Sequence, residues 1–253
     1  KPYLNPILRR IGSTVLKGLM HVLCARLDGV IAATPFIRDR LKKANPNTID
    51  ICNYPINHEM TEATNDVGER LSVTYIGNIG ETRGISELLK AMEYVQHPVR
   101  LELVGSFNDA ATEARARAMP GWKCVTYHGW VGRDEVVAAL KRSLVGIVVL
   151  RPHPNYVDAL PVKMFEYMGG GVPVIASDFP LWRSIVEEAD CGILVDPLDP
   201  LDLAAAIDEI HADKNRSAEM GRNGSKAALV KYNWGVEEVK LIGFYREMLG
   251  KAG

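Results

Sequence analysis

The sequence predicts an α/β fold in which a doubly wound parallel sheet is preceded by part of a second α/β domain. After residue 70, six short apolar runs alternate with helical patterns. Before residue 56, one further strand–helix–strand pattern occurs. Strands that alternate with helices are joined by crossover connections, and these connections produce parallel sheets.

The six strands of the main sheet are expected at residues 71–76, 99–104, 123–127, 144–150, 172–176 and 192–195. The helices between them are expected at residues 86–95, 110–118, 134–142, 162–168 and 181–188. The chain after residue 200 reads as helical throughout. Six strands with five crossovers are typical of the doubly wound class.

The beginning of the chain has a different pattern. Residues 5–26 place apolar side chains at helical spacing among several basic ones, so we expect a helix that covers a sheet, with docking on a membrane surface as the alternative. Residues 29–33, 35–43 and 48–52 then read as strand, helix and strand. Two strands are too few for a stable sheet. We therefore expect the end of a domain whose earlier strands are missing, in a piece cut from a longer protein.

Composition excludes several classes of function. The 253 residues are 47% hydrophobic and carry a formal net charge of −1, which gives no basic footprint for nucleic acid. No apolar run reaches the roughly 18 residues of a membrane span. The four cysteines are far apart in the sequence, so we expect buried free thiols in a reducing compartment.

Residues 158–177, DALPVKMFEYMGGGVPVIAS, combine two carboxylates with a helix start and a glycine triplet. Pro161 suits the first position of a helix, and glycines 169–171 suit its end. Asp158 then lies just ahead of the helix and Glu166 lies on it. Because a helix N-terminus attracts anions, a phosphorylated ligand rich in hydroxyl groups fits this stretch.

Ligands of open parallel sheets bind beyond the carboxyl ends of the strands. The first such end, residues 77–84, has three glycines and Arg83, which suits a phosphate, although glycines there also serve simple turns. Gly105 and the loop 128–132 end the next two strands, where Trp130 and Val131 are placed to frame a base. We expect these strand ends to converge on the helix that starts at Pro161.

Two other interpretations of the acidic residues remain open at this point. Asp158 and Glu166 have the residue types of a glycosidase pair, whereas a carboxylate on a helix also suits the hydroxyls of a ribose. Asp196, Asp199 and Asp202 suggest a metal site, but the prolines at 197 and 200 favour turn and N-cap roles.

Taken together, these motifs resemble the family 4 retaining glycosyltransferases, which have the two-domain GT-B fold. The resemblance rests on an acidic residue, seven residues and a glutamate (Asp158 and Glu166), followed by GVPVIAS at 171–177. CGILVDP at 191–197 and YNW at 232–234 extend it over residues 71–249. It implies a truncated N-terminal acceptor domain at 1–60, a linker at 61–70, a donor-binding Rossmann-like domain at 71–233, and a C-terminal helix at 234–253 that crosses back.

The resemblance also implies roles for individual residues. Asp158 would contact the donor sugar as the catalytic residue, and Glu166 would hold the ribose. The donor nucleotide would further be bound by Gly77, Asn78, Gly80, Arg83, Val131, Leu160, Pro161, Val162 and Lys163. Asn78 stands where the family usually has an arginine, and Lys163 is the candidate to compensate for it.

The implied activity is metal-independent transfer of a sugar from a UDP- or GDP-linked donor, with retained configuration, to a saccharide or lipid-linked acceptor. Such enzymes act in the synthesis of cell-envelope polysaccharides or glycoconjugates, in the cytoplasm or at the inner face of the membrane. We expect these 253 residues alone to bind nucleotide and to transfer sugar poorly. The alternatives are a nucleotide-sugar 2-epimerase of the same fold and a non-catalytic nucleotide-sugar-binding subunit.

Overall fold

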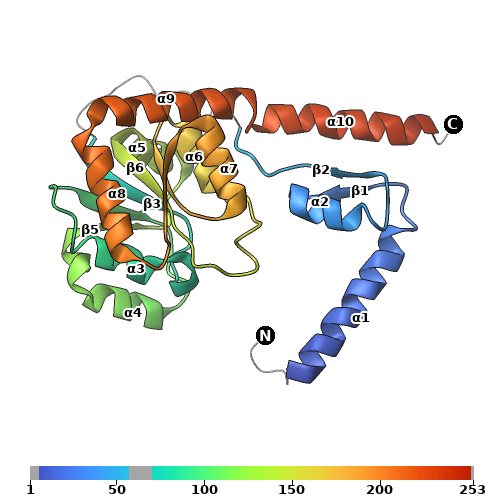
Figure 1. The fold of residues 1–253 in the computed structure, drawn as a ribbon, viewed down its shortest axis with the longest axis horizontal. Coiled ribbons are helices and arrows are strands. Elements are labelled where there is room, and N and C mark those ends of the chain that lie inside the picture. The colour runs from blue at the N-terminus through green and yellow to red at the C-terminus, as the bar shows by residue number, and fades with distance from the viewer. Residues whose placement is uncertain (1–5, 57–69, 252–253) are drawn as a thin grey trace. The chain divides into compact units, whose positions relative to one another are not determined.

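The computed structural model describes residues 6–56 and 70–251. The chain divides into two compact units, one made of Lys1–Asn53 with Glu237–Gly253 and the other of Tyr54–Val236. The predicted linker at 61–70 lies outside the described residues, apart from Arg70. The larger unit carries the main sheet (Figure 1).

Six parallel strands form this sheet in the order β5-β4-β3-β6-β7-β8. They are β3 (Ser72–Ile76), β4 (Arg100–Val104), β5 (Val125–Gly129), β6 (Ser143–Val148), β7 (Val174–Ser177) and β8 (Gly192–Val195). The chain begins in the middle, extends the sheet to one side, and returns past β3 to extend it on the other. The predicted doubly wound topology is confirmed.

Helices cover both faces of the sheet (Figure 1). One face packs against α3 (Ile85–Ala91), α4 (Ala110–Ala118) and α8 (Pro200–Ala212). The other face packs against α5 (Arg133–Arg142), α6 (Val162–Gly169), α7 (Pro180–Ala189) and α9 (Lys214–Val230). Neighbouring strand residues alternate between the two cores, as Val174 and Ile175 of β7 do, because successive side chains of a strand point to opposite faces.

Helix α6 covers the predicted range 162–168, although Pro161 is not its first residue. Pro161 is its N-cap, with extended backbone, and Val162 is its first residue. The helix ends at Gly169, and in the glycine triplet only Gly171 has the left-handed conformation, with φ of 65°. Most side chains of α6 are buried, because the helix packs between the sheet and α9.

Tyr167 ties α6 to the central strand β3. Its hydroxyl accepts the N–H of Ile76 at 2.8 Å and donates to the carbonyl of Thr74 at 3.1 Å. Pairing between β3 and β6 ends at Thr74 and Gly146, so the tyrosine hydroxyl serves the backbone groups beyond that point. Gly146 leaves space for the ring, since a Cβ there would lie 2.2 Å from it.

The smaller unit contains the predicted strand–helix–strand pattern. Strands β1 (Val30–Ala32) and β2 (Thr48–Asp50) pair in parallel, and α2 (Pro35–Leu41) connects them in the chain. Thr34 caps α2 by accepting the N–H of Ile37. The Asn45 amide donates to the carbonyls of Cys24 and Leu27, which fixes the end of α1 (Pro6–Cys24). The carboxylate of Glu237, on α10 (Trp234–Lys251), accepts the N–H of Cys52 at 2.7 Å.

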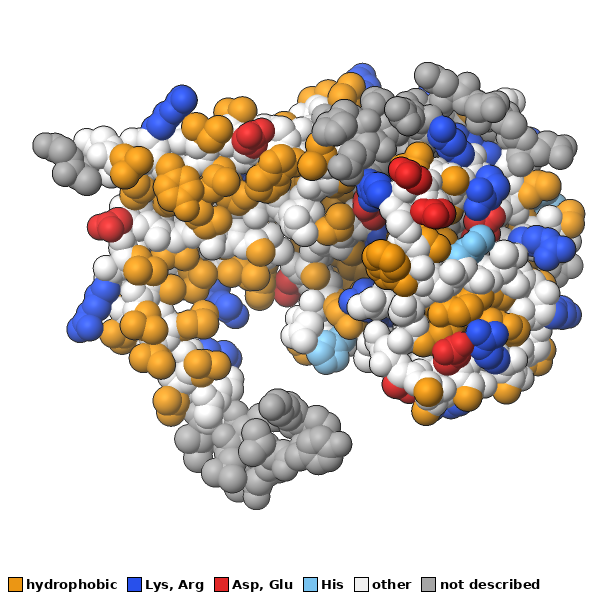
Figure 2. Space-filling view, turned by 180° about the vertical axis from the view of Figure 1, so that it is seen from behind, with side chains coloured by type: hydrophobic (Ala, Val, Ile, Leu, Met, Phe, Trp, Pro, Cys, Tyr) orange, Lys and Arg blue, Asp and Glu red, His pale blue; other side chains and the backbone are white. Residues whose placement is uncertain are grey.

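The expectation that α1 packs on a sheet is not met within the described chain. Its apolar side chains are exposed, Val15 by 65% and Leu19 by 53%. Figure 2 shows apolar side chains at the surface of this unit. Among the described residues, no helix has both the length and the hydrophobicity needed to cross a bilayer.

The cysteines match their prediction in part. The four form no disulfide with one another; Cys52 and Cys191 are buried, and the other two are half-buried. Burial raises the pKa of the Cys191 thiol to about 12, with the Asp190 carboxylate adding to the shift. This thiol is therefore a core side chain and is protonated at neutral pH.

Candidate functional site

Three neighbouring strand ends meet at one edge of the sheet, and each has a glycine with positive φ. The φ angles of Gly77, Gly105 and Gly129 are 118°, 139° and 69°. The N–H of Gly105 donates to the carbonyl of Gly129 at 2.7 Å. A Cβ at Gly105 would lie 2.0 Å from the carbonyl oxygen of Gly77, so only glycine allows this approach. These three strand ends lie side by side and form a floor made of backbone, which we call the glycine edge. Their convergence on the start of α6 stays a prediction.

The loop 77–84 leads from this floor into the 3₁₀ helix η3 (Glu81–Arg83) and then α3. The Asn78 side chain is exposed, while its carbonyl accepts the Tyr75 hydroxyl at 2.6 Å. Gly80 has extended backbone and is buried against Asn108. The Arg83 guanidinium is half-buried, 5.8 Å from the centre of the Tyr156 ring. This loop therefore brings a cation, Arg83, to the edge of the sheet.

Lys163, the second residue of α6, is buried without a hydrogen-bond partner among the described residues. Its Nζ lies 3.6 Å from the centre of the Tyr75 ring. Burial lowers the pKa of Lys163 well below its usual value; Arg83 lowers it further and Glu166 opposes the shift. An ammonium group has three donors, and no oxygen of the described residues accepts them. An anionic acceptor from a ligand would satisfy this group.

The segment before α6 leaves the N-terminus of that helix uncapped by any side chain. Leu160 packs against the core of this face, and the carbonyl of Ala159 accepts the Trp182 indole N–H at 2.7 Å. Asp158 is half-buried and makes no hydrogen bond or ion pair with another described residue. The N–H groups of the first helical turn, which includes Val162, point out of the helix end.

Glu166 pairs with Arg133, the first residue of α5. Nη1 of the arginine lies 2.6 Å from Oε1 of the glutamate, and the glutamate side chain is only 15% exposed. This contact joins the start of α5 to the middle of α6, and both helices cover the same face of the sheet. Sequence reasoning found Glu166 but not its partner.

The loop after β5 carries the residues expected near a base. Trp130 is 81% exposed, whereas Val131 packs against the core of the α5 face. Val131 and His128 line a small cavity of about 120 Å³. His128 belongs to β5, and its Nε2 lies 3.5 Å from the Glu102 carboxylate, which agrees with the interpretation of His128 as a strand-end residue.

The aspartates of the DPLDPLD stretch form a turn and a cap, as the prolines indicated. Asp199 is the N-cap of α8 and accepts the N–H of Leu201. Asp202 accepts the N–H of Asp196, whose own carboxylate accepts the N–H of Leu198. These carboxylates are thus occupied by backbone donors.

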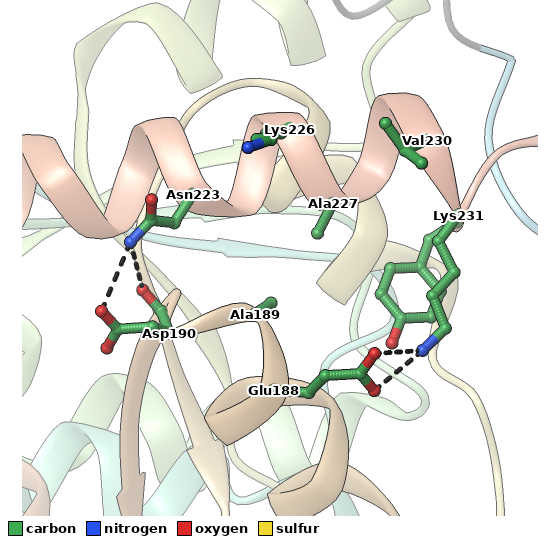
Figure 3. Close-up of a pocket in the computed structure, with 9 residues that line it drawn as sticks. Glu188, Ala189, Asp190, Asn223, Lys226, Ala227, Val230 and Lys231 are labelled. Atoms are coloured by element: carbon green, nitrogen blue, oxygen red, sulfur yellow. Dashed lines mark hydrogen bonds and ion pairs between the residues drawn. The ribbon is translucent and has the colours of Figure 1, made fainter.

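Two other polar clusters contain none of the residues predicted to bind the donor. In the smaller unit, Asp50, Cys52 and Glu237 offer ligand atoms within 4.8 Å of one another, but the Lys240 ammonium already binds both carboxylates. In the larger unit, a hollow of about 440 Å³ lies between the end of α7 and α9 (Figure 3). Its Glu188 pairs with Lys231 at 2.6 Å. The charges in both clusters are neutralised by their own neighbours.

Comparison with known proteins identifies the family. Residues 58–227 match the family model of the glycosyl transferases group 1, which is more than half of the chain. The chain belongs to the group 1 glycosyl transferases. Its curated relatives include a D-inositol 3-phosphate glycosyltransferase of Xylanimonas cellulosilytica, 24% identical over 83% of this chain and 52% of that protein. A phosphatidyl-myo-inositol mannosyltransferase of Mycolicibacterium smegmatis is 24% identical over 94% of this chain and 62% of the relative. The chain thus spans about half to two thirds of their length.

Solved structures of GT-B glycosyltransferases share the fold of this group 1 member. A sucrose-phosphate synthase of Thermosynechococcus elongatus gives a TM-score of 0.71 at 23% identity, over 93% of this chain and 62% of that one. The Anabaena protein HepE in complex with UDP-glucose gives 0.74 at 16% identity, over 91% and 68%. These similarities establish the GT-B type of fold.

Two residues beside the predicted site were missed from the sequence. Tyr75 reads as an ordinary core residue of a strand, yet its ring contacts Lys163 and its hydroxyl holds the 77–84 loop. Arg133 directly follows the Val131 loop, and its position at a helix start beside a predicted ligand loop was a usable signal. The structure brings Arg83, Lys163 and Tyr75 together, and it joins Arg133 to Glu166.

Proposed function

We propose that the larger unit binds the donor of a glycosyltransferase, a nucleoside-diphosphate sugar, and that the parent enzyme transfers the sugar to an acceptor with retained configuration. The observation that supports this most strongly is Lys163, which is buried beside Arg83 near the start of α6. Among the described residues, no group accepts a hydrogen bond from its ammonium and no side chain caps the helix. A diphosphate supplies the missing acceptors and the missing negative charge.

In this proposal each group has a task that its chemistry supports. Lys163, Arg83 and the first N–H groups of α6 stabilise the charge that grows on the departing nucleoside diphosphate. Glu166 accepts the ribose hydroxyls, and Asp158 lies next to the donor sugar. The glycine floor lets the phosphates approach the backbone closely. Transfer then proceeds without a metal, because these cations and N–H groups do the electrostatic work.

The finer assignments belong to the same proposal. The names of the curated relatives support glycoconjugate synthesis as the setting, with a saccharide or lipid-linked acceptor. The complex of HepE with UDP-glucose supports a nucleotide-linked donor. The acceptor, which supplies the nucleophile, would be bound by the N-terminal domain of the GT-B enzyme.

Calorimetric titration of the 253-residue chain with UDP, GDP and ADP tests donor binding. We expect one of them to bind, and Glu166→Ala and Arg83→Ala each to weaken that binding by about 1–3 kcal/mol, the scale of a hydrogen bond to a charged group. The controls are Glu113→Ala and Arg117→Ala, which break an exposed ion pair on α4. Binding of none of the three nucleotides, or unchanged affinity in both site variants, would overturn the proposal.

A further inference from the structure

The contact between Arg133 and Glu166 uses only part of the glutamate. Nη1 of the arginine donates to Oε1 at 2.6 Å, and among the described residues Oε2 accepts no hydrogen bond. A carboxylate has about four lone-pair sites on its two oxygens. The pair therefore leaves acceptor capacity on Glu166 while fixing where its carboxylate lies.

The surroundings of Glu166 make this fixation consequential. The side chain is 15% exposed, so few waters compete with the arginine for it. Its charge also acts on Lys163, whose Nζ has no hydrogen-bond partner among the described residues. Without Arg133, the glutamate carboxylate could turn toward the ammonium of Lys163, on which its charge already acts. The arginine thus keeps Glu166 and Lys163 apart as two separate binding groups.

We propose that Arg133 is a positioning residue for nucleotide recognition, which holds the Glu166 carboxylate in place for the ribose hydroxyls of the bound donor. This inference rests on the proposed function. It assigns Arg133 no contact with the nucleotide: the arginine acts through Glu166. The opposite possibility is that the arginine competes with the ribose for the same oxygens, and the two possibilities predict opposite changes in affinity.

The test compares UDP and GDP with their 2′-deoxy forms in titrations of the wild-type chain and of Arg133→Ala. In the wild type, loss of the 2′-hydroxyl should weaken binding by about tenfold or more, since the acceptor is a charged group. In Arg133→Ala, the ribonucleotide should bind about tenfold more weakly, and the difference between ribo and deoxy forms should fall below about threefold. That loss of discrimination is specific to positioning, because a general loss of stability would weaken both forms alike.

Two further variants complete the experiment. Arg133→Lys keeps a cation for the contact with Glu166, and it should restore part of the discrimination between ribo and deoxy forms. Arg142→Ala removes the arginine at the other end of α5, which pairs with Glu102, and it should leave the discrimination unchanged. Thermal unfolding confirms that each variant is folded.

The outcomes distinguish the role of Arg133 from donor binding itself. Unchanged discrimination in folded Arg133→Ala overturns the role of Arg133 and leaves donor binding intact. Tighter binding of the ribonucleotide by that variant also overturns it, in favour of competition. Absence of nucleotide binding by the wild-type chain overturns the proposed function and this inference together.

Discussion

Charged side chains in two regions of the sheet differ in how fully they are hydrogen-bonded. Asp208, on α8, accepts the N–H groups of Gln96 and His97, which precede β4. It also pairs with the His97 ring at 2.7 Å. In the middle of β4, Glu102 accepts two bonds from Arg142 and one from Ser72. At the glycine edge, by contrast, the described residues give Lys163 no hydrogen bond and Glu166 one.

The difference indicates which charges serve the fold and which serve a ligand. A buried polar group without a partner costs about 1–3 kcal/mol, more when it is charged. Natural folds rarely keep such a group unless something else completes it. The saturated carboxylates stabilise the free protein, whereas in the proposed function an arriving anion supplies the hydrogen bonds that the described residues do not give Lys163.

The largest effect is expected for Lys163→Met. The variant should weaken binding of the nucleoside diphosphate by about 1.5–3 kcal/mol, because it removes a hydrogen bond between charged groups. It should leave the free energy of unfolding unchanged or raise it, because methionine fills a similar volume without a buried charge. Titration and denaturant unfolding measure the two quantities.

Lys141→Met, on the exposed surface of α5, is the matched control and should change neither quantity. A strongly destabilised Lys163→Met with normal nucleotide affinity would contradict this interpretation. Lys163 would then be a packing residue, and the two regions would not differ in the way described.

A smaller effect is expected for Glu102→Gln, which should change the free energy of unfolding and not the nucleotide affinity. Burial raises the pKa of Glu102, but hydrogen bonds from Arg142 and Ser72 and the charge of Arg142 lower it, and the net shift is downward. The ionised carboxylate therefore stabilises the fold. Glutamine should lower the free energy of unfolding by about 1 kcal/mol, a modest value because Arg142 is half-exposed. Nucleotide affinity should not change. An equal loss of stability and of nucleotide affinity would contradict the difference between the two groups of charged side chains.

The smallest effect is a pH dependence of nucleotide binding. The pKa of free Lys163 is lowered by burial and by Arg83, against the opposing charge of Glu166, and a bound diphosphate should raise it again. Above the lowered pKa, binding must take up a proton, so affinity should fall as pH rises toward the usual value of 10.5. The slope is at most about tenfold per pH unit for one proton.

Titrations in buffers of different ionisation enthalpy would detect this proton uptake directly. The diphosphate itself contributes little, because its last ionisation lies near pH 6 by analogy with phosphate esters. Lys163→Met should abolish the dependence. In the same pH window the free energy of unfolding of the nucleotide-free protein should rise with pH, because the unfolded lysine binds more protons than the folded one. If the nucleotide affinity of the wild type did not change with pH, Lys163 would already be protonated before the nucleotide binds.

The elements and the position of the candidate site were predictable from the sequence, because they depend on local patterns. Alternation of apolar runs fixes the strands, and glycines after three of them mark backbone that only glycine adopts easily. The range 162–168 of α6 was predicted correctly, although Pro161 serves as its N-cap and not as its first residue.

The side-chain pairs were not predictable. Arg133 and Glu166 are 33 residues apart in the sequence, and no local pattern says which of several arginines will reach the glutamate. Lys163 would be exposed on an ordinary amphipathic helix, but α6 is covered on two sides and buries it. The exposed apolar side chains of α1 follow the helical pattern correctly, yet the pattern says nothing about what covers them.

The Tyr167 hydroxyl, which serves Ile76 and Thr74 in place of a strand neighbour, has a mechanical consequence. Sliding α6 along β3 would break both hydrogen bonds and move the ring out of the space that Gly146 leaves for it, so helix and strand move as one rigid body. The helix start and the loop after β3 are then held at a fixed spacing before any ligand arrives. Binding there loses little conformational entropy, and adjustment to different ligands is left to the surface loops.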